Sequence, residues 1–193
     1  REALPERFFD VGIAEQHAVT MAAGLAMGGM KPVVAIYSSF LQRAYDQMLH
    51  DVALQRLHVV FAIDRAGLVG ADGETHQGVY DIAYCLTMPY VEIYSPASKG
   101  ELEEMLKMAV EGDVPAAVRY GKGTLPDRVY PEVEYGKWIE IKPIANVTVV
   151  ATGRMVEIAE RAVENLDVGL VNARFIRPMD EAMLDIIKQK ASY

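Results

Sequence analysis

The sequence is poor in cysteine and has no long hydrophobic run. Cys85 is the only cysteine among 193 residues. An intrachain disulfide or a site with several thiolate ligands therefore cannot form, and a reducing compartment, the cytoplasm, is favoured. No apolar run approaches the roughly 20 residues that span a bilayer, and the first residues lack the layout of a signal peptide. We therefore expect a protein without membrane contact.

Positive charge is also scarce. The chain has 19 Lys and Arg residues against 27 Asp and Glu residues, which gives a formal net charge of −8. The cations are scattered along the chain, so they provide little attraction to phosphate backbones or anionic lipids. Nucleic-acid and membrane-surface functions are therefore disfavoured. Hydrophobic residues make up 51% of the chain and charged residues 24%, which is typical of a folded globular protein.

Several common catalytic and binding motifs are missing. No Gly-Lys-Ser/Thr string follows the glycines at 67, 70 and 73, which argues against a P-loop or a dinucleotide fingerprint. The four histidines form no pair at i, i+4, which argues against a dedicated zinc site. Ser38 and Ser39 lack the Gly-x-Ser-x-Gly elbow, so a helix cap explains them better than a nucleophile.

Short runs rich in Val and Ile alternate with longer segments of helical period. This alternation indicates the α/β class, with a doubly wound, mainly parallel sheet covered on both faces. The predicted strands are 7–11, 32–37, 58–64, 90–94, 116–120, 147–151 and 169–172. The predicted helices are 14–27, 39–55, 78–86, 98–111 and 155–165, with a last one after Arg177-Pro178. Ser98 and Glu101 have the spacing of a capping box.

Glycine and proline punctuate residues 121–143, where both periodicities weaken, as in an interdomain connection. We predict a first domain at 1–124, a linker at 125–143 and the beginning of a second α/β domain at 144–193. Two strands and two helices do not complete a domain, and both ends of the sequence look cut. We therefore expect a fragment of a longer protein.

Glu15 is the first candidate functional residue. It follows a predicted strand and the turn at Gly12, and it begins a helix rich in alanine and glycine. Such a helix can approach another backbone closely or lie in a subunit interface, which suggests a dimer and would leave Glu15 in a dry environment. The alternative is a carboxylate that only complements the helix dipole.

The loop RAGLVGADGETHQG at 65–78 follows the predicted strand 58–64. Ligands of open α/β sheets bind at the carboxyl ends of strands. The four glycines would let the loop fold over a ligand, while Arg65 supplies a fixed cation and His76 a titratable group. The alternative is a solvated turn.

These motifs together resemble the thiamine-diphosphate enzymes of the transketolase superfamily. The matching strings are DVGIAEQHAV at 10–19, AIYSSFLQRAYDQ at 35–47, AIDRAG at 62–67, GADGETHQG at 70–78, AVRY at 117–120 and ARFIRPMD at 173–180. The loop at 70–78 points to the branch that condenses pyruvate with D-glyceraldehyde 3-phosphate. The resemblance covers essentially the whole chain.

The resemblance implies that residues 1–124 bind the aminopyrimidine ring of thiamine diphosphate. Glu15 would then bond N1′ of that ring, and Tyr37, Phe40 and Arg43 would wall its pocket, with Phe40 as the stacking face. The implied reaction releases CO2 from pyruvate and proceeds through an enamine on the cofactor. A homodimer is also implied.

The same resemblance implies roles for four residues near the substrates. Asp72 and His76 would line the substrate chamber, with His76 moving a proton or binding a hydroxyl group. Arg65 and Arg119, at the ends of two strands, would hold the phosphate of the aldehyde in a fork that lysine cannot reproduce.

One departure from the family pattern concerns the metal. The superfamily holds Mg²⁺ and the cofactor diphosphate through Gly-Asp-Gly followed by a distant Asn, and this chain has no Gly-Asp-Gly. The resemblance therefore implies that the Mg²⁺ ligands lie in an amino-terminal domain, and that this chain alone is inactive and binds the cofactor weakly. Two alternatives stay open. One is a subunit of a split enzyme, either a transketolase or a 2-oxo-acid dehydrogenase β subunit, and the other is a noncatalytic α/β module.

Overall fold

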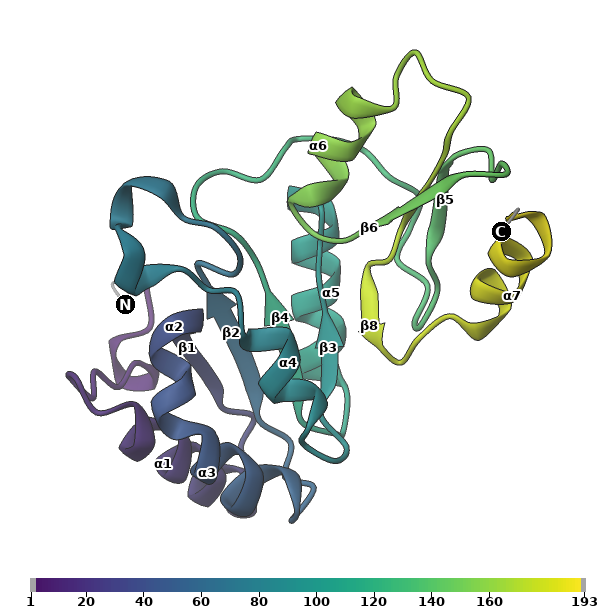
Figure 1. Cartoon of the computed structure of the whole chain (residues 1–193). Coiled ribbons are helices and arrows are strands. Elements are labelled where there is room, and N and C mark those ends of the chain that lie inside the picture. Colours follow the sequence, from purple (N-terminus) through teal and green to yellow (C-terminus); the bar gives the residue numbers. More distant parts are fainter. Residues whose placement is uncertain (1–2, 192–193) are drawn as a thin grey trace.

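The computed structural model describes residues 3–191, which form two α/β units (Figure 1). The first unit contains a five-stranded sheet of order β1-β2-β4-β3-β8, and the second contains a three-stranded sheet of order β5-β7-β6. The strands of the first sheet are β1 (Val33–Tyr37), β2 (Val60–Asp64), β3 (Glu92–Tyr94), β4 (Ala116–Arg119) and β8 (Phe175–Arg177). Those of the second are β5 (Ile139–Lys142), β6 (Thr148–Ala151) and β7 (Gly169–Asn172).

Four strands of the first sheet are parallel to one another, and β8 is antiparallel to its neighbour β3. The α-helices are α1 (Glu15–Met27), α2 (Ser38–Leu41), α3 (Tyr45–Gln47), α4 (Asp81–Leu86), α5 (Lys99–Glu111), α6 (Met155–Ala162) and α7 (Glu181–Lys190). This architecture confirms the predicted α/β class with a mainly parallel sheet and a smaller second α/β unit.

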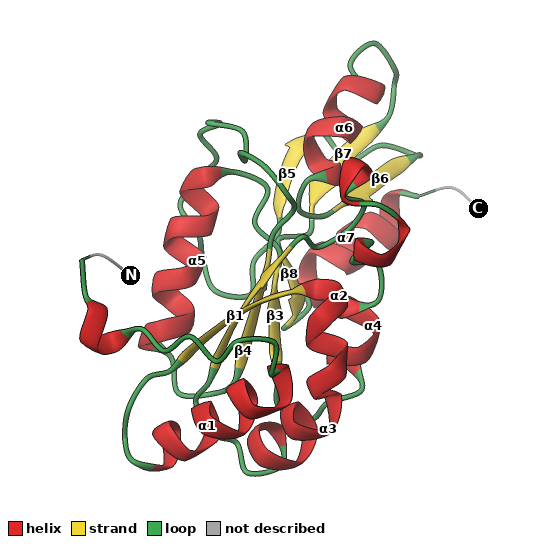
Figure 2. Cartoon of the chain, turned by 90° about the vertical axis from the view of Figure 1, so that its left-hand side faces the viewer, coloured by secondary structure: helices red, strands yellow, loops and turns green. Residues whose placement is uncertain are grey.

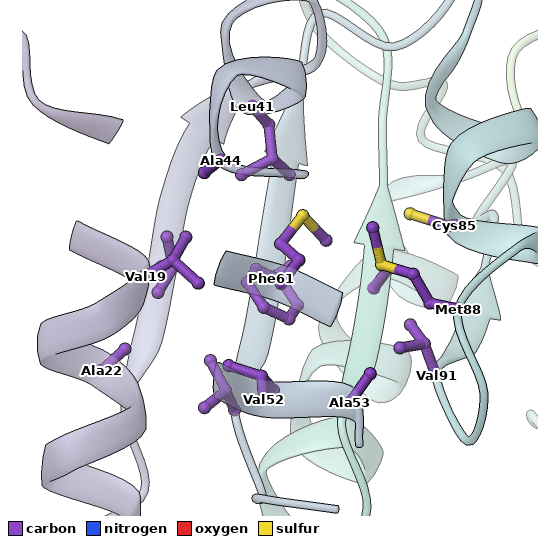
Figure 3. Packing of buried hydrophobic residues seen from close by; sticks show 14 of the residues in the cluster. Val19, Ala22, Leu41, Ala44, Val52, Ala53, Phe61, Cys85, Met88 and Val91 are labelled. Carbon is purple, nitrogen blue, oxygen red and sulfur yellow. The ribbon is translucent and has the colours of Figure 1, made fainter. Parts of the chain in front are cut away.

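The first sheet is covered on both faces because alternate strand residues point in opposite directions. Phe61 joins the core formed with α1 and the 38–53 segment, whereas the adjacent Val60 joins the core formed with α5. Figure 2 shows the strands between α5 and the helices of the opposite face. Figure 3 shows Phe61 between Val19 of α1 and Met88. Burial raises the pKa of the Cys85 thiol in this core to about 12, and nearby Asp81 adds to the shift.

The predicted strand at 7–11 is wrong. A 3-10 turn occupies Pro5–Arg7, and residues 8–12 have no strand assignment. These residues and β1 both line one cavity of about 1040 Å³. Among residues 3–191, β1 is the edge strand of its sheet and pairs with β2, so no ladder hydrogen bonds define a strand at 8–12.

The predicted single helix at 39–55 is a run of different helical pitches. The α-helical turns α2 and α3 are separated by a 3-10 turn at Gln42–Ala44, and a π-helix follows at Met48–Ala53. Met48, Val52 and Ala53 are all fully buried. The wider π turn lets residues four and five positions after Met48 face the same core.

The sequence analysis missed two strands, and one of them, β8, ties the second unit to the first. Strand β5 lies within the predicted linker and pairs with β7, whereas β8 is the edge strand of the first sheet. The guanidinium of Arg177 adds three hydrogen bonds between β8 and the first unit. It donates to the carbonyl oxygens of Leu86, Met88 and Val91. The domain boundaries at 124 and 143 stay a prediction.

Candidate active site

The predicted site residues lie at the carboxyl edge of the parallel strands. Tyr37 ends β1, Arg65 follows β2, and Arg119 ends β4, which is the neighbour of β2. Parallel strands bring their carboxyl ends to one edge of the sheet, where ligands of α/β folds collect. This shared edge explains how residues far apart in the sequence come together.

Glu15 is the first residue of α1 and is 8% exposed. Nη1 of Arg43 donates to both of its carboxylate oxygens, at 3.1 and 3.2 Å. Half of the Arg43 side chain is exposed. The carboxylate therefore has the favourable position in the first helical turn and also a specific cationic partner, so it does more than complement the helix dipole.

An aromatic cluster lies beside this ion pair. The rings of Phe40 and Tyr37 are stacked, with centroids 5.4 Å apart, and the His76 ring meets the edge of Phe40 at 5.0 Å. The guanidinium carbon of Arg43 is 5.3 Å from the Phe40 centroid, and Arg65 lies 3.9 Å over the Tyr37 ring. Glu15, Tyr37 and Phe40 line the cavity of about 1040 Å³. A flat heterocycle placed there would meet one carboxylate and an aromatic face.

The 65–78 loop is closed on itself. The backbone groups of Gly67 and Gly78 exchange hydrogen bonds of 2.6 and 2.8 Å. The side chain of Gln77 accepts from Val69 N and donates to Gly73 O. A Cβ at Gly78 would lie 2.2 Å from Arg65 O and 2.7 Å from the side chain of Ser38, so a glycine is required for this close approach. These contacts argue against a freely solvated turn.

A charged cluster connects this loop with the segment after β4. Arg65 pairs with Asp64 and lies 3.6 Å from Asp72, and Nζ of Lys122 donates to Asp72. The hydrogen bond from Lys122 lowers the pKa of Asp72 against the opposing effect of desolvation, and the charges of Lys122, Arg65 and His76 lower it further. Desolvation lowers the pKa of Arg65, but the hydrogen bond and charge of Asp64 outweigh it and raise that pKa.

The guanidinium of Arg119 is turned toward another partner. Its Nε donates to Asp81 at 2.5 Å and its Nη1 donates to Ser95 at 3.1 Å. The side chains of Arg119 and Asp81 are 11% and 2% exposed. Arg119 therefore lies at the predicted edge of the sheet, but its hydrogen-bonding fork is engaged by a buried carboxylate.

The structure thus gathers Glu15, Tyr37, Phe40, Arg43, Arg65, Asp72 and His76 around one edge of the sheet. The sequence analysis missed Lys122, which contacts Asp72, because Lys122 lies in the stretch 121–143, where both periodicities weaken. The signal that could have found it is its distance of three residues from the end of a strand.

Residues 3–191 contain neither a cluster of metal-ligating side chains nor a membrane-spanning helix. No group of three or more His, Cys, Asp or Glu residues could hold a metal ion in this part of the chain. No described helix combines the length and the apolar character needed to span a membrane.

The fold and the site define a class of protein. Residues 2–128 match the transketolase pyrimidine binding domain, and residues 136–193 match the transketolase C-terminal domain. The chain therefore belongs to the transketolase family, which confirms the resemblance seen in the sequence.

The particular relatives share one name. The 1-deoxy-D-xylulose-5-phosphate synthase of Clostridium tetani is 53% identical over 188 residues, which cover 94% of this chain and 30% of the relative. An enzyme of the same name from Thermus thermophilus is 54% identical over 184 residues, which cover 93% of this chain and 30% of that relative. This chain thus spans about 30% of the curated relatives that it matches.

Solved structures agree with the fold. A structure described as a split-gene transketolase, an inactive β4 tetramer, superposes with a TM-score of 0.87 at 29% identity, covering 98% of this chain and 64% of that one. A transketolase variant from Pichia stipitis superposes with a TM-score of 0.75 at 20% identity, covering 91% of this chain and 28% of that one. The second likeness shows the fold alone.

Proposed function

We propose that this chain is part of a 1-deoxy-D-xylulose-5-phosphate synthase, which condenses pyruvate with D-glyceraldehyde 3-phosphate and releases CO2. The observation that carries the proposal is the buried Glu15 carboxylate in a cavity that Tyr37 and Phe40 also line. Identities of 53% and 54% to enzymes of that name support this substrate pair.

The residues present fit the aminopyrimidine ring of thiamine diphosphate. Glu15 would accept a hydrogen bond at N1′ of the ring, and Phe40 would stack on the ring face. A charge-assisted hydrogen bond is strong in a dry site, and Glu15 is 8% exposed. When bound, the cofactor supplies the nucleophilic carbon and accepts the electrons released with CO2. Arg43, whose side chain is half exposed, supplies the charge that offsets the burial of Glu15.

We assign Asp72 and His76 to the substrate chamber. The His76 ring contacts Phe40, so its nitrogens can reach groups next to the cofactor pocket. Asp72 accepts a hydrogen bond from Lys122 and lies 3.6 Å from Arg65, so its negative charge holds two cations in place. In this proposal His76 moves a proton or binds a hydroxyl group, and Asp72 orients the cations.

We assign the phosphate of the aldehyde to Arg65 and Lys122. Both side chains are partly exposed, at 24% and 36%, and both contact Asp72. The sequence analysis predicts Arg119 as the second phosphate-binding residue beside Arg65, but the guanidinium of Arg119 is hydrogen bonded to Asp81. Lysine binds phosphate as a point charge without the bidentate geometry of arginine. The comparison of Lys122 and Arg119 variants separates these two assignments.

We assign the Mg²⁺ and the cofactor diphosphate to a portion of the enzyme outside this chain. The chain has no Gly-Asp-Gly string. The chain alone is then expected to be inactive and to bind the cofactor weakly, and the active form is expected to be a homodimer.

A second candidate is the subunit of a split thiamine-diphosphate enzyme that transfers a ketol unit between sugar phosphates. The specific observation is the TM-score of 0.87 to the split-gene transketolase, which covers 98% of this chain. Its 29% identity is well below the 53% identity of the synthase relative. The donor distinguishes the two candidates, because only the synthase consumes pyruvate.

The test joins this chain to the amino-terminal portion of the Clostridium tetani relative. Calorimetry with thiamine diphosphate and Mg²⁺ measures cofactor binding, and CO2 release from pyruvate in the presence of D-glyceraldehyde 3-phosphate measures activity. Binding heat with aldehyde-dependent CO2 release supports the synthase. Activity only with a ketose phosphate donor supports the split transketolase, and the absence of both heat and activity supports a noncatalytic module.

A further inference from the structure

The turn between β6 and α6 reaches from the second unit to the charged edge of the first. Its residues are Thr152, Gly153 and Arg154. The hydroxyl of Thr152 donates to the carbonyl oxygen of Ala173 at 2.8 Å, and Ala173 N donates to Ala151 O. The turn is therefore fixed to its own sheet on one side.

Gly153 makes the first contact with the other unit. Its φ is +56°, and a Cβ at this position would lie 2.8 Å from Ser95 Oγ. The same Cβ would lie 3.7 Å from Nη1 of Arg119, which donates to Ser95. A side chain at 153 would be strained and would collide with Ser95, so a glycine is required for the close packing of the two units.

Arg154 makes the second contact. Its Nη1 donates to the carbonyl oxygen of Lys122 at 3.2 Å. Its Cδ lies 3.5 Å from the position that a Cβ of Gly121 would take. The segment 120–122, which Arg154 contacts, is also held to the 65–78 loop. Ala66 N donates to Tyr120 O at 3.0 Å.

We propose that Arg154 is a positioning residue for the phosphate end of the site, and this inference rests on the proposed synthase function. By holding the backbone of Lys122, Arg154 keeps the Lys122 ammonium beside Asp72 and Arg65. Through this single arginine, the second unit sets the affinity of the site for a phosphorylated aldehyde.

The alkyl stem and the guanidinium of Arg154 have separable roles. The stem packs on Gly121, whereas only the guanidinium donates to Lys122. Arg154→Met keeps most of the alkyl stem and removes the hydrogen-bond donor. Arg154→Lys keeps a donor, but on a shorter side chain. Arg161→Ala is the control, because it removes a 78% exposed cation from α6, the helix that follows this turn, and its partner is Glu157.

The experiment is steady-state kinetics of the holoenzyme that contains this chain, with D-glyceraldehyde 3-phosphate and with unphosphorylated glyceraldehyde as acceptors. We expect Arg154→Met to raise KM for the phosphorylated acceptor about three- to tenfold, in line with the loss of one hydrogen bond. The kcat, the KM for pyruvate and the KM for glyceraldehyde should change less than about twofold. The reason is that Lys122 is assigned to the phosphate, which pyruvate and glyceraldehyde lack.

Arg154→Lys should recover part of the lost affinity, and Arg161→Ala should behave as wild type. Equal effects of Arg154→Met on both acceptors, or a KM no different from that of Arg161→Ala, would overturn the positioning role. If the wild-type holoenzyme binds the cofactor but does not turn over pyruvate with any acceptor, the synthase assignment fails instead. A thermal melt of each variant separates both outcomes from misfolding.

Discussion

A single nitrogen of Arg43 is shared between the two carboxylate oxygens of Glu15, at 3.1 and 3.2 Å. The carboxylate is buried at the start of α1, while half of the arginine side chain faces solvent. The pair therefore joins a buried carboxylate that lines the cavity to a half-exposed cation. This arrangement lets a ligand with hydrogen-bonding nitrogens approach Glu15 without leaving the carboxylate unpaired beforehand.

Replacement of Glu15 tests its proposed role at N1′ of the cofactor. In the full-length enzyme, Glu15→Ala is expected to lower kcat by roughly 100-fold or more, the scale of a lost acid or base group. The control is Glu6→Ala, because Glu6 lines the same cavity but is exposed. Steady-state CO2 release at saturating substrate measures kcat. A Glu15→Ala enzyme with wild-type kcat would contradict the assignment.

Replacement of Lys122 is expected to weaken binding of the acceptor, whereas replacement of Arg119 is expected to lower the stability of the fold. Lys122→Ala should weaken binding of the phosphorylated aldehyde by about 1.5 to 3 kcal/mol, which is the contribution of a charged hydrogen bond. The free energy of unfolding should change little. Arg119→Ala leaves Asp81, whose side chain is 2% exposed, without its main partner. Loss of one member of a buried ion pair costs about 3 to 5 kcal/mol.

Two measurements on the same variants decide between them. Urea unfolding gives the free energy of unfolding, and acceptor kinetics give KM. If Arg119→Ala folds with wild-type stability and raises only the KM of the phosphorylated aldehyde, the phosphate role belongs to Arg119, as the sequence analysis predicted.

Arg174 is expected to be a main link between the two units. Its guanidinium pairs with Glu101 of α5 and donates to the carbonyl oxygens of Pro131 and Glu132. The side chains of Arg174 and Glu101 are 1% and 2% exposed. Arg174→Met should lower the free energy of unfolding by about 3 to 5 kcal/mol, because it removes the cationic partner of a buried carboxylate.

Lys188→Met is the comparison for Arg174→Met. Lys188 pairs with Asp185 on the surface of α7, where both side chains are more than half exposed. A surface pair of this kind contributes about 0 to 1 kcal/mol. Denaturant unfolding followed by circular dichroism measures both variants. Equal stability of the two would show that the Arg174 cluster is not a link of this strength.

The sequence could predict the parts of this structure that follow from local patterns. The apolar runs at 58–64 and 116–120 lie on β2 and β4, and Ser98 caps α5 by accepting from Glu101 N at 3.2 Å. Periodicity and capping depend on neighbours a few residues apart, so they can be read from one segment at a time.

Other features depend on residues that are distant in the sequence. Nothing near Glu101 indicates that its carboxylate would meet Arg174, which lies 73 positions away. The three residues of β8 become a strand only because the edge of β3 is available to pair with them. The position of Lys122 after β4 could place it at the edge of the sheet, but its contact with Asp72 requires two loops to meet, so the sequence could not show that contact.

Asp72 gives a prediction about pH. The hydrogen bond and charge of Lys122, with the charge of Arg65, hold the pKa of Asp72 below its ordinary value of 3.8. A carboxyl group whose pKa is lower in the folded state stabilises that state at every pH above the unfolded value. This contribution is lost as the pH falls through the folded pKa. Asp72 should therefore stay ionised from pH 5 upward and cannot donate a proton at neutral pH.

Carbon-detected NMR of the Asp72 carboxyl group, titrated with acid, measures this directly. We expect a midpoint below 3.8 in the wild type and a higher midpoint in Lys122→Ala, because that variant removes the first cause of the shift. The stability difference between wild type and Asp72→Asn should be constant from pH 5 to 8 and should shrink below the ordinary pKa. A midpoint above 3.8 in the wild type would mean that Lys122 and Arg65 do not hold this carboxylate in solution.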